Sequence, residues 1–275
     1  MPQANSWWRD HRRWVELFVL VNVSFLALDI YLAHSVNRFR EPGEYVPLYF
    51  SLAAPAVLLI ALVADLIQPR AAVWRDMGYL VGWLAIAVGL AGVVLHLDSR
   101  FFHERTLKSL VYAAPFAAPL AYTGLGLLLV MNRMVEADSA EWPMWVLLMA
   151  LGGFFGNFLF SVTDHAQNAF YHWTEWIPVV SSAFAVGFLT VPFLTPVTRP
   201  YLWLSGGVLA VQAAVGVLGF FLHVSGNLSG VSPHLWDNIV FGAPPLAPLL
   251  FPNLVLLALI SLWVLRSLLP AGTNA

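Results

Sequence analysis

The chain has 275 residues, of which 60% are hydrophobic and only 10% are charged. Soluble domains are about half apolar and about one quarter charged, so this composition excludes a water-soluble globule, and its apolar content excludes a disordered chain. The net charge of −2 offers no basic surface for nucleic acid, and the absence of cysteine excludes disulfides, thiolate ligands and iron–sulfur clusters.

Long apolar runs follow one another along the chain. A membrane-spanning helix needs about 20 mostly apolar residues, and eight runs qualify: 14–34, 46–68, 78–97, 107–131, 142–163, 176–194, 201–223 and 240–268. The first run is longer than a signal-peptide core and no clear cleavage site follows it, so we expect it to be retained. The sequence therefore predicts an all-α integral membrane protein with eight transmembrane helices and the lipid bilayer as its main partner.

Basic residues predict the orientation. An even number of spans places both termini on one side, and the segments on that side hold more arginines than the opposite segments, as the positive-inside rule requires of the cytoplasmic face. The Trp7–Trp8 pair fits an interfacial anchor on the same side. We expect both termini to be cytoplasmic, in a bacterial inner membrane. The inner residues are Arg9, Arg12, Arg13, Arg70, Arg75, Arg133, Arg199 and Arg266, and the outer ones are Arg38, Arg40, Arg100, Arg105 and Lys108.

Four landmarks recur in the same order in the two halves of the chain. They are a His with a Glu ten residues later, a second His after a glycine-rich run, and a Pro-x3-Pro pair. The first half has His34, Glu44, His96 and Pro115–Pro119, and the second has His165, Glu175, His223 and Pro244–Pro248. This recurrence predicts a tandem duplication of a four-helix unit, 1–135 and 136–275. Since four spans return the chain to its starting side, the repeats would be parallel, with a pseudo-twofold axis along the membrane normal.

Seven of the eight histidines fall on the predicted outer side. The four recurring histidines end predicted helices, His103, His172 and His234 lie in outer connections, and only His11 is inside. At a rise of about 1.5 Å per residue the first helix spans roughly 30 Å, so His34 reaches the outer edge of the hydrocarbon. We therefore expect the four recurring histidines and the two glutamates in one shallow layer at the periplasmic face.

Imidazole and carboxylate together suit transition metals such as Fe, Cu and Zn. The sequence predicts a metal site, either one dinuclear centre on the pseudo-axis or one site in each half. The expected ligands are His34, Glu44, His96, His165, Glu175 and His223. Carboxylates that hold the second ring nitrogen of a ligand histidine are expected nearby, and the candidates are Asp29, Asp98, Asp164 and Asp237.

The Pro-x3-Pro pairs predict irregular backbone in the outer halves of spans 107–131 and 240–268. Each proline removes a backbone donor and frees a carbonyl about one turn earlier. In a membrane such carbonyls persist where they are satisfied by a neighbour or face a cavity. Either a packing kink or a carbonyl-lined vestibule at the depth of the histidines would result.

These features favour a metal-binding membrane oxidoreductase or redox subunit, working with other membrane subunits or a periplasmic redox partner. Three alternatives stay open. One is a bis-histidine haem b electron-transfer protein, which the glutamates at the ligand layer disfavour. Another is a lipid hydrolase with a metal-activated water. The last is a non-catalytic assembly subunit whose histidines only end helices.

Overall fold

The described part of the chain is helical throughout. A computed structural model describes residues 10–68 and 72–269, and these contain no strand. The all-α class is therefore confirmed. The main helices are α1 (His11–Ser35), α2 (Tyr45–Ile67), α3 (Ala72–Asp98), α6 (Leu120–Met134), α7 (Glu141–Gln167), α8 (Trp176–Thr190), α9 (Arg199–Leu228) and α11 (Leu250–Leu268). The Trp7–Trp8 pair, Arg9 and Arg70 lie outside the described residues.

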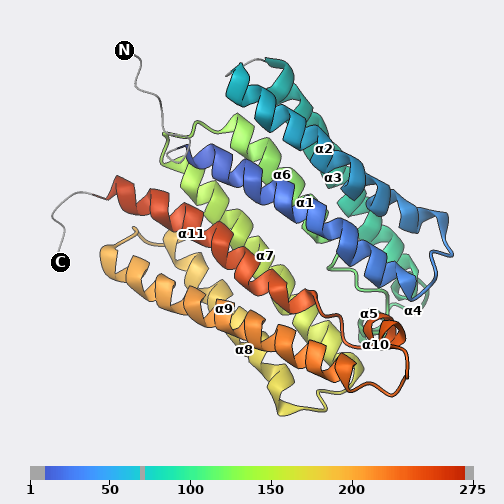
Figure 1. Cartoon of the computed structure of the whole chain (residues 1–275). Coiled ribbons are helices and arrows are strands. Elements are labelled where there is room, and N and C mark those ends of the chain that lie inside the picture. The colour runs from blue at the N-terminus through green and yellow to red at the C-terminus, as the bar shows by residue number, and fades with distance from the viewer. Residues whose placement is uncertain (1–9, 69–71, 270–275) are drawn as a thin grey trace.

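Short helices connect the long ones. They are η2 (Pro42–Glu44), α4 (Phe101–Glu104), α5 (Leu107–Val111), η3 (Trp173–Glu175), η4 (Val191–Phe193), α10 (Leu235–Phe241) and η5 (Ala247–Leu249). In Figure 1, α4, α5 and α10 gather at one end of the bundle, while α1 begins and α11 ends at the opposite end.

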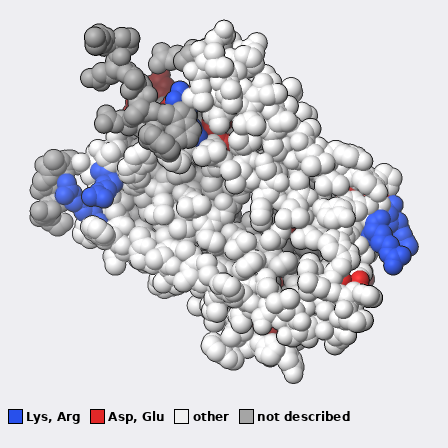
Figure 2. Space-filling model, viewed as in Figure 1, with Lys and Arg blue, Asp and Glu red and all other residues white. Residues whose placement is uncertain are grey.

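The surface of the bundle is that of a protein that spans a membrane several times. Seven helical segments in the described residues are long and apolar enough to cross a membrane, α2, α8 and α11 being counted together with the 3₁₀ turns that adjoin them, whereas α6 has only 15 residues. Large apolar side chains such as Ile67, Leu80 and Trp203 are 60% or more exposed, which lipid tolerates and water does not. Figure 2 shows charged side chains mainly toward the two ends, with a broad uncharged band between them.

Two of the predicted spans are broken rather than continuous. The expected helix 107–131 is wrong, since α5 ends at Val111 and α6 begins only at Leu120. The expected helix 240–268 is also wrong, since α10 ends at Phe241 and α11 begins at Leu250 after the 3₁₀ turn η5. Both breaks contain a Pro-x3-Pro pair. Proline lacks the amide donor and disfavours helical backbone in the residue before it, so two prolines at this spacing interrupt the helix.

The core lies along α1, α7 and α11 in the middle of the bundle, where α11 contacts both α1 and α7 (Figure 1). Helices α2, α3 and α6 lie on one side of them, and α8 and α9 lie on the other. Val15, Val19 and Val23 recur every four residues along α1 and are fully buried. This spacing gives one continuous stripe on the face of α1 that packs inward.

Two polar links cross the core. At the end where α1 begins, Arg133 Nη2 donates to Glu16 Oε2 at 2.7 Å, and Asn132 Nδ2 donates to Glu16 Oε1 at 2.8 Å. Near the middle of the bundle, the side-chain amides of Asn22 in α1 and Asn253 in α11 hydrogen-bond each other reciprocally. Each amide or charge therefore finds its partner inside the protein, as burial away from water demands.

Candidate functional site

The four recurring histidines form two pairs, one within each half of the chain. The ring centroids of His34 and His96 are 6.1 Å apart with an interplanar angle of 70°. Those of His165 and His223 are 6.4 Å apart with an angle of 84°. In the first pair His34 comes from the last turn of α1 and His96 from α3. In the second pair His165 comes from the last turn of α7 and His223 from α9. His223 does not end its helix as expected, because α9 continues to Leu228.

A glutamate and an asparagine hold the first histidine of the first pair. His34 Nδ1 lies 3.4 Å from Glu44 Oε1, and Asn37 Nδ2 donates to the same oxygen at 2.6 Å. The backbone N–H of Glu41 donates to the other carboxylate oxygen at 3.4 Å. The side chain of Glu44 is only 10% exposed, so these contacts replace water around its charge.

The second half repeats this arrangement with longer contacts. His165 Nδ1 lies 3.9 Å from Glu175 Oε2, and Asn168 Nδ2 donates to Glu175 Oε1 at 3.2 Å. The two side chains of the His–Glu pair are 17% and 12% exposed. Each glutamate therefore faces the Nδ1 side of its histidine.

A left-handed turn after α1 and α7 brings the asparagine and the glutamate back to the histidine. The N–H of Phe39 donates to the carbonyl of His34 at 3.2 Å, and the N–H of Phe170 donates to the carbonyl of His165 at 3.0 Å. These bonds close the helix ends in the manner of left-handed C-caps. In these two turns the residues with positive φ are Arg38, Phe39, Ala169 and Phe170.

A proline carbonyl holds the second histidine of each pair. His96 Nδ1 lies 2.9 Å from the carbonyl oxygen of Pro115, and His223 Nδ1 lies 2.8 Å from that of Pro244. A carbonyl oxygen can only accept a hydrogen bond, so Nδ1 carries the proton and Nε2 keeps a lone pair in the neutral ring. The prolines thus have two roles: they interrupt the helix, and their carbonyl oxygens accept the hydrogen bond from the histidine Nδ1.

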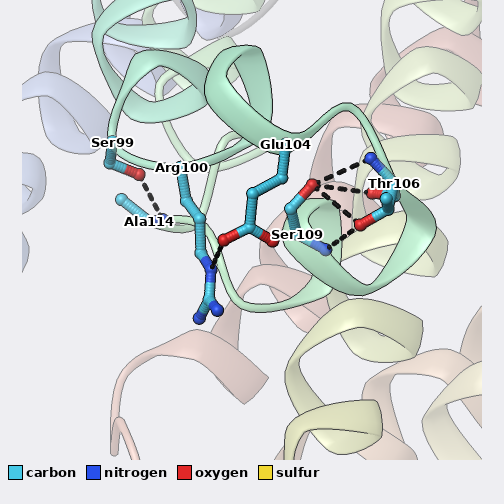
Figure 3. Close-up of polar contacts among 6 residues, drawn as sticks. All are labelled: Ser99, Arg100, Glu104, Thr106, Ser109 and Ala114. Carbon is cyan, nitrogen blue, oxygen red and sulfur yellow. Dashed lines mark hydrogen bonds and ion pairs between the residues drawn. The ribbon is translucent and has the colours of Figure 1, made fainter.

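Further contacts fix those irregular segments. In the first half, the N–H of Ala114 donates to Ser99 Oγ at 2.9 Å, and this hydroxyl donates to the carbonyl of His96 at 2.6 Å. Figure 3 shows the Ser99–Ala114 bond beside the Arg100–Glu104 ion pair and the reciprocal Thr106–Ser109 bonds that begin α5.

In the second half an asparagine takes the place of Ser99. Asn227 Oδ1 accepts from the N–H of Ala243 at 3.0 Å, and Asn227 Nδ2 donates to the carbonyl of Ala243 at 2.9 Å. Both halves also need a glycine where the helices cross. A Cβ atom on Gly89 would overlap the carbonyl of Pro119, and one on Gly216 would overlap the carbonyl of Pro248. These glycines allow the close approach that places each proline segment beside its histidine.

The glutamates do not complete a metal-binding cluster. In the described residues no group of three or more His, Asp or Glu side chains is placed to hold a metal ion. The physical reason is visible at Glu44, whose oxygens already accept from Asn37 and from the backbone of Glu41. The structure therefore gathers the six expected ligands into two groups of three, each made of a histidine pair and one glutamate.

The other expected partners take different places. Asp98 lies 3.9 Å from His103 Nε2 at the surface, and Asp237 accepts from Ser232 Oγ at 3.0 Å. Asp29 lies within electrostatic range of His34. Of the four aspartates, Asp164 comes closest to the expected position, since it lines a pocket together with His165 and His223.

The three remaining histidines of the connections and His11 stay outside the pairs. His172 precedes η3 with its ring edge-on to Tyr171, and His234 precedes α10. His11 Nε2 lies 2.8 Å from the carbonyl of Ala137, and its ring contacts Trp142 at the opposite end of the bundle.

The pocket in the second half extends inward from the histidine pair. Its empty volume is about 590 Å³, including its open mouth. Helices α7, α8, α9 and α11 and the turn η5 enclose it, and its wall is mostly apolar with polar side chains on the α7 side. The lining residues are Asn157, Phe160, Ser161, Asp164, His165, Thr174, Ile177, Pro178, Val215, Leu218, Gly219, Leu222, His223, Ala247, Pro248 and Phe251.

Sequence reasoning missed the asparagines and the proline carbonyls. Asn37 and Asn168 stand three residues after His34 and His165 in both halves, so the recurring H-x2-N spacing is a usable signal. The acceptor role of the Pro115 and Pro244 carbonyls has no signal in the sequence, because it depends on how the irregular segments fold back.

Together these observations define a helical, multi-span membrane protein with two similar histidine pairs. No protein-family model, no curated protein and no solved structure matches the chain.

Proposed function

We propose that the protein is a membrane-bound redox subunit that binds one transition-metal ion at each histidine pair. The observation that carries this proposal is the environment of Nδ1: a proline carbonyl holds it in His96 and His223, and a glutamate faces it in His34 and His165 at 3.4 and 3.9 Å, which leaves Nε2 as the nitrogen for a metal ion. Metal-binding histidines are commonly held this way, with the second ring nitrogen on a carboxylate or a backbone carbonyl. Glu44 and Glu175 then serve as positioning groups instead of ligands.

The spacing of the rings fits this role. Metal–nitrogen bonds of about 2.0–2.1 Å place the centroids of two imidazoles on one ion roughly 5 to 6.5 Å apart. The pairs have centroid separations of 6.1 and 6.4 Å. Because each pair forms within one half, the geometry favours two separate sites over one dinuclear centre. Imidazole donors without thiolate suit copper, zinc and iron, and a redox role selects copper or iron.

Metal analysis of the purified protein tests the proposal. The wild-type protein should hold one ion for each pair, His96→Ala should lose one, and His96→Ala combined with His223→Ala should lose both. His103→Ala with His234→Ala is the matched control, because these histidines lie at the same end but outside the pairs, and its metal content should equal that of the wild type. A metal-free wild-type protein, or unchanged metal in the double variant, would overturn the proposal.

Haem b is the second candidate, and the ring spacing is the observation that favours it. Two axial imidazoles on opposite faces of one haem iron have centroids roughly 6.5 Å apart, which is close to the separation in both histidine pairs. A reduced-minus-oxidised visible spectrum separates the candidates. A sharp α band that disappears in His96→Ala with His223→Ala establishes haem, and a spectrum without that band excludes it.

We also infer that the two halves, 1–135 and 136–275, are a tandem duplication with parallel topology. The repeated support consists of the His–Glu–Asn group, the left-handed turn, the proline carbonyl and the glycine contact, each in the same order. The start of α1 and the end of α11 at one end of the bundle fit an even number of crossings (Figure 1).

The histidine end is proposed to face the periplasm. The chain has no cysteine, so single-cysteine variants can be labelled without background. Ser229→Cys and Asp138→Cys are suitable because both residues are exposed, near α10 and just before α7 respectively. In intact cells a membrane-impermeant maleimide should label the first and spare the second. The reverse pattern would place the histidines in the cytoplasm.

A further inference from the structure

The pocket of the second half has the lining of a ligand site. Most of its wall is apolar and a few polar side chains point to it from α7, the composition typical of small-molecule sites. Phe160, Phe251 and Pro178 supply flat apolar walls. Such walls favour contact with a flat apolar body.

One buried donor in this pocket has no partner. The side chain of Asn157 is 6% exposed, lines the pocket, and its Nδ2 makes no hydrogen bond in the described protein. A buried amide N–H without an acceptor is costly, and native proteins rarely keep one. The Nδ2 group of Asn157 can therefore donate a hydrogen bond to an acceptor on a bound molecule, such as a carbonyl oxygen.

The sequence of the first half supports a specific role for these polar groups. Positions 131 residues earlier than Asn157, Ser161 and Asp164 are Leu26, Ile30 and Ala33. The histidine pair thus does not require polar residues on this helix face, because the first pair forms above apolar ones. The polar face of α7 is an addition to the site.

One wall of the pocket borders the apolar outer surface of α9. Leu218 and Leu222 of α9 line the pocket, and they are 46% and 47% exposed among other apolar side chains. A molecule dissolved in the bilayer is therefore close to this wall of the pocket.

We propose that this pocket binds a neutral, lipid-soluble carbonyl compound of the quinone class, with a carbonyl oxygen accepting from Asn157. The flat apolar ring lies between the aromatic and proline walls, and the tail leaves past Leu218 and Leu222. The bound ring is then adjacent to His165 and His223, which line the same pocket. This site goes beyond the proposed metal sites and does not depend on them.

Calorimetric titration of the purified protein in detergent tests the proposal. Decylubiquinone should bind the wild type saturably, and Asn157→Leu, which installs the residue found at position 26, should weaken binding about tenfold or more through loss of a buried hydrogen bond. Thr163→Val is the matched control, because Thr163 lies on the same helix, bonds only to carbonyls of its own helix and does not line this pocket. Its affinity should equal that of the wild type.

A second ligand separates loss of the hydrogen bond from loss of the fold. Decylbenzene has a flat ring and the same tail but no carbonyl, so it should bind more weakly than the quinone to the wild type and equally to wild type and Asn157→Leu. The proposal is overturned if decylubiquinone does not saturate, if Asn157→Leu binds it unchanged, or if decylbenzene binds the wild type as tightly. Metal analysis of the same samples tells this failure apart from failure of the proposed metal sites.

Discussion

The two halves of the molecule share the histidine layer and its immediate contacts, and they differ in the polar groups farther from it. In both, a glutamate and a proline carbonyl hold a histidine pair at the same end of the bundle. The first half keeps an ion pair, Glu16–Arg133, at the other end, where the equivalent positions of the second half are Leu147 and Leu262. The second half instead has the polar pocket below its histidines.

This contrast indicates which interactions the pair itself needs. The contacts present in both halves are sufficient to position two imidazoles, because each pair forms although its other surroundings differ. Contacts present in only one half have another role, such as stability at the end opposite the histidines or ligand binding. Variants made at equivalent positions in the two halves can separate these roles.

The largest effect is expected at the ion pair of the first half. Glu16 and Arg133 are 19% and 10% exposed, so Glu16→Leu leaves an unpaired buried guanidinium and should lower the free energy of unfolding by about 3–5 kcal/mol. Glu16→Leu combined with Arg133→Leu copies the second half and should recover most of that loss. Unfolding of the purified protein in detergent measures both. A double variant as unstable as Glu16→Leu would show that the leucines of the second half are not an equivalent solution.

A smaller effect is expected at the glutamates, and it should be unequal between the halves. Glu44→Gln removes the charge that faces His34 Nδ1 at 3.4 Å, whereas in Glu175→Gln the lost contact to His165 is 3.9 Å. Residues that orient metal-binding histidines typically contribute about 10–100-fold in metal affinity. We expect the upper part of that range for Glu44→Gln and the lower part for Glu175→Gln in metal titrations.

Glu104→Gln is the control for this pair of variants. Glu104 forms an exposed ion pair with Arg100 at the same end of the bundle and does not contact the histidines (Figure 3). Its metal affinity should not change. Equal losses in Glu44→Gln and Glu104→Gln would mean that general electrostatics, and not the orientation of His34, governs metal affinity.

Next in size is the difference between Tyr122 and Phe251, which stand three residues after the second proline of each pair. The hydroxyl of Tyr122 bonds to Ser51 and to the carbonyl of Pro47, and this position is Phe in the second half. Tyr122→Phe should cost about 1–2 kcal/mol of unfolding free energy, because buried Ser51 loses its partner. Phe251→Tyr should bring no gain in stability, since Ser182 already bonds to the carbonyl of Pro178. A stabilised Phe251→Tyr would show that the two halves are more alike below the histidines than their contacts indicate.

Sequence patterns are sufficient for the features that depend on composition and spacing. Apolar runs locate the helices, and the recurring His, Glu and Pro residues locate both histidine pairs. The interruptions at Pro115–Pro119 and Pro244–Pro248 do not follow from the sequence, because a pair of prolines permits a kink or a break and packing decides between them. The role of Glu44 does not follow either, since a carboxylate near imidazole is either a ligand or a partner of Nδ1. In the structure the Glu44 oxygens already accept from Asn37 and from the backbone of Glu41, contacts that the sequence does not reveal.

The smallest effects are expected at the residues that hold the proline segments, and they test whether the two halves bind metal independently. Asn227 makes two hydrogen bonds to Ala243, whereas Ser99 accepts one from Ala114. Ser99→Ala should cost about 0.5 kcal/mol of unfolding free energy, and Asn227→Ala slightly more, at about 1 kcal/mol. Neither change removes a metal donor, so any effect on metal must act through the Pro115 or Pro244 carbonyl and its histidine. Ser99→Ala should therefore weaken only the ion that His96→Ala removes, and Asn227→Ala only the ion that His223→Ala removes. If Ser99→Ala weakened metal binding at both pairs equally, the two pairs would be coupled through the core of α1, α7 and α11. The two sites would then be one cooperative unit and not independent.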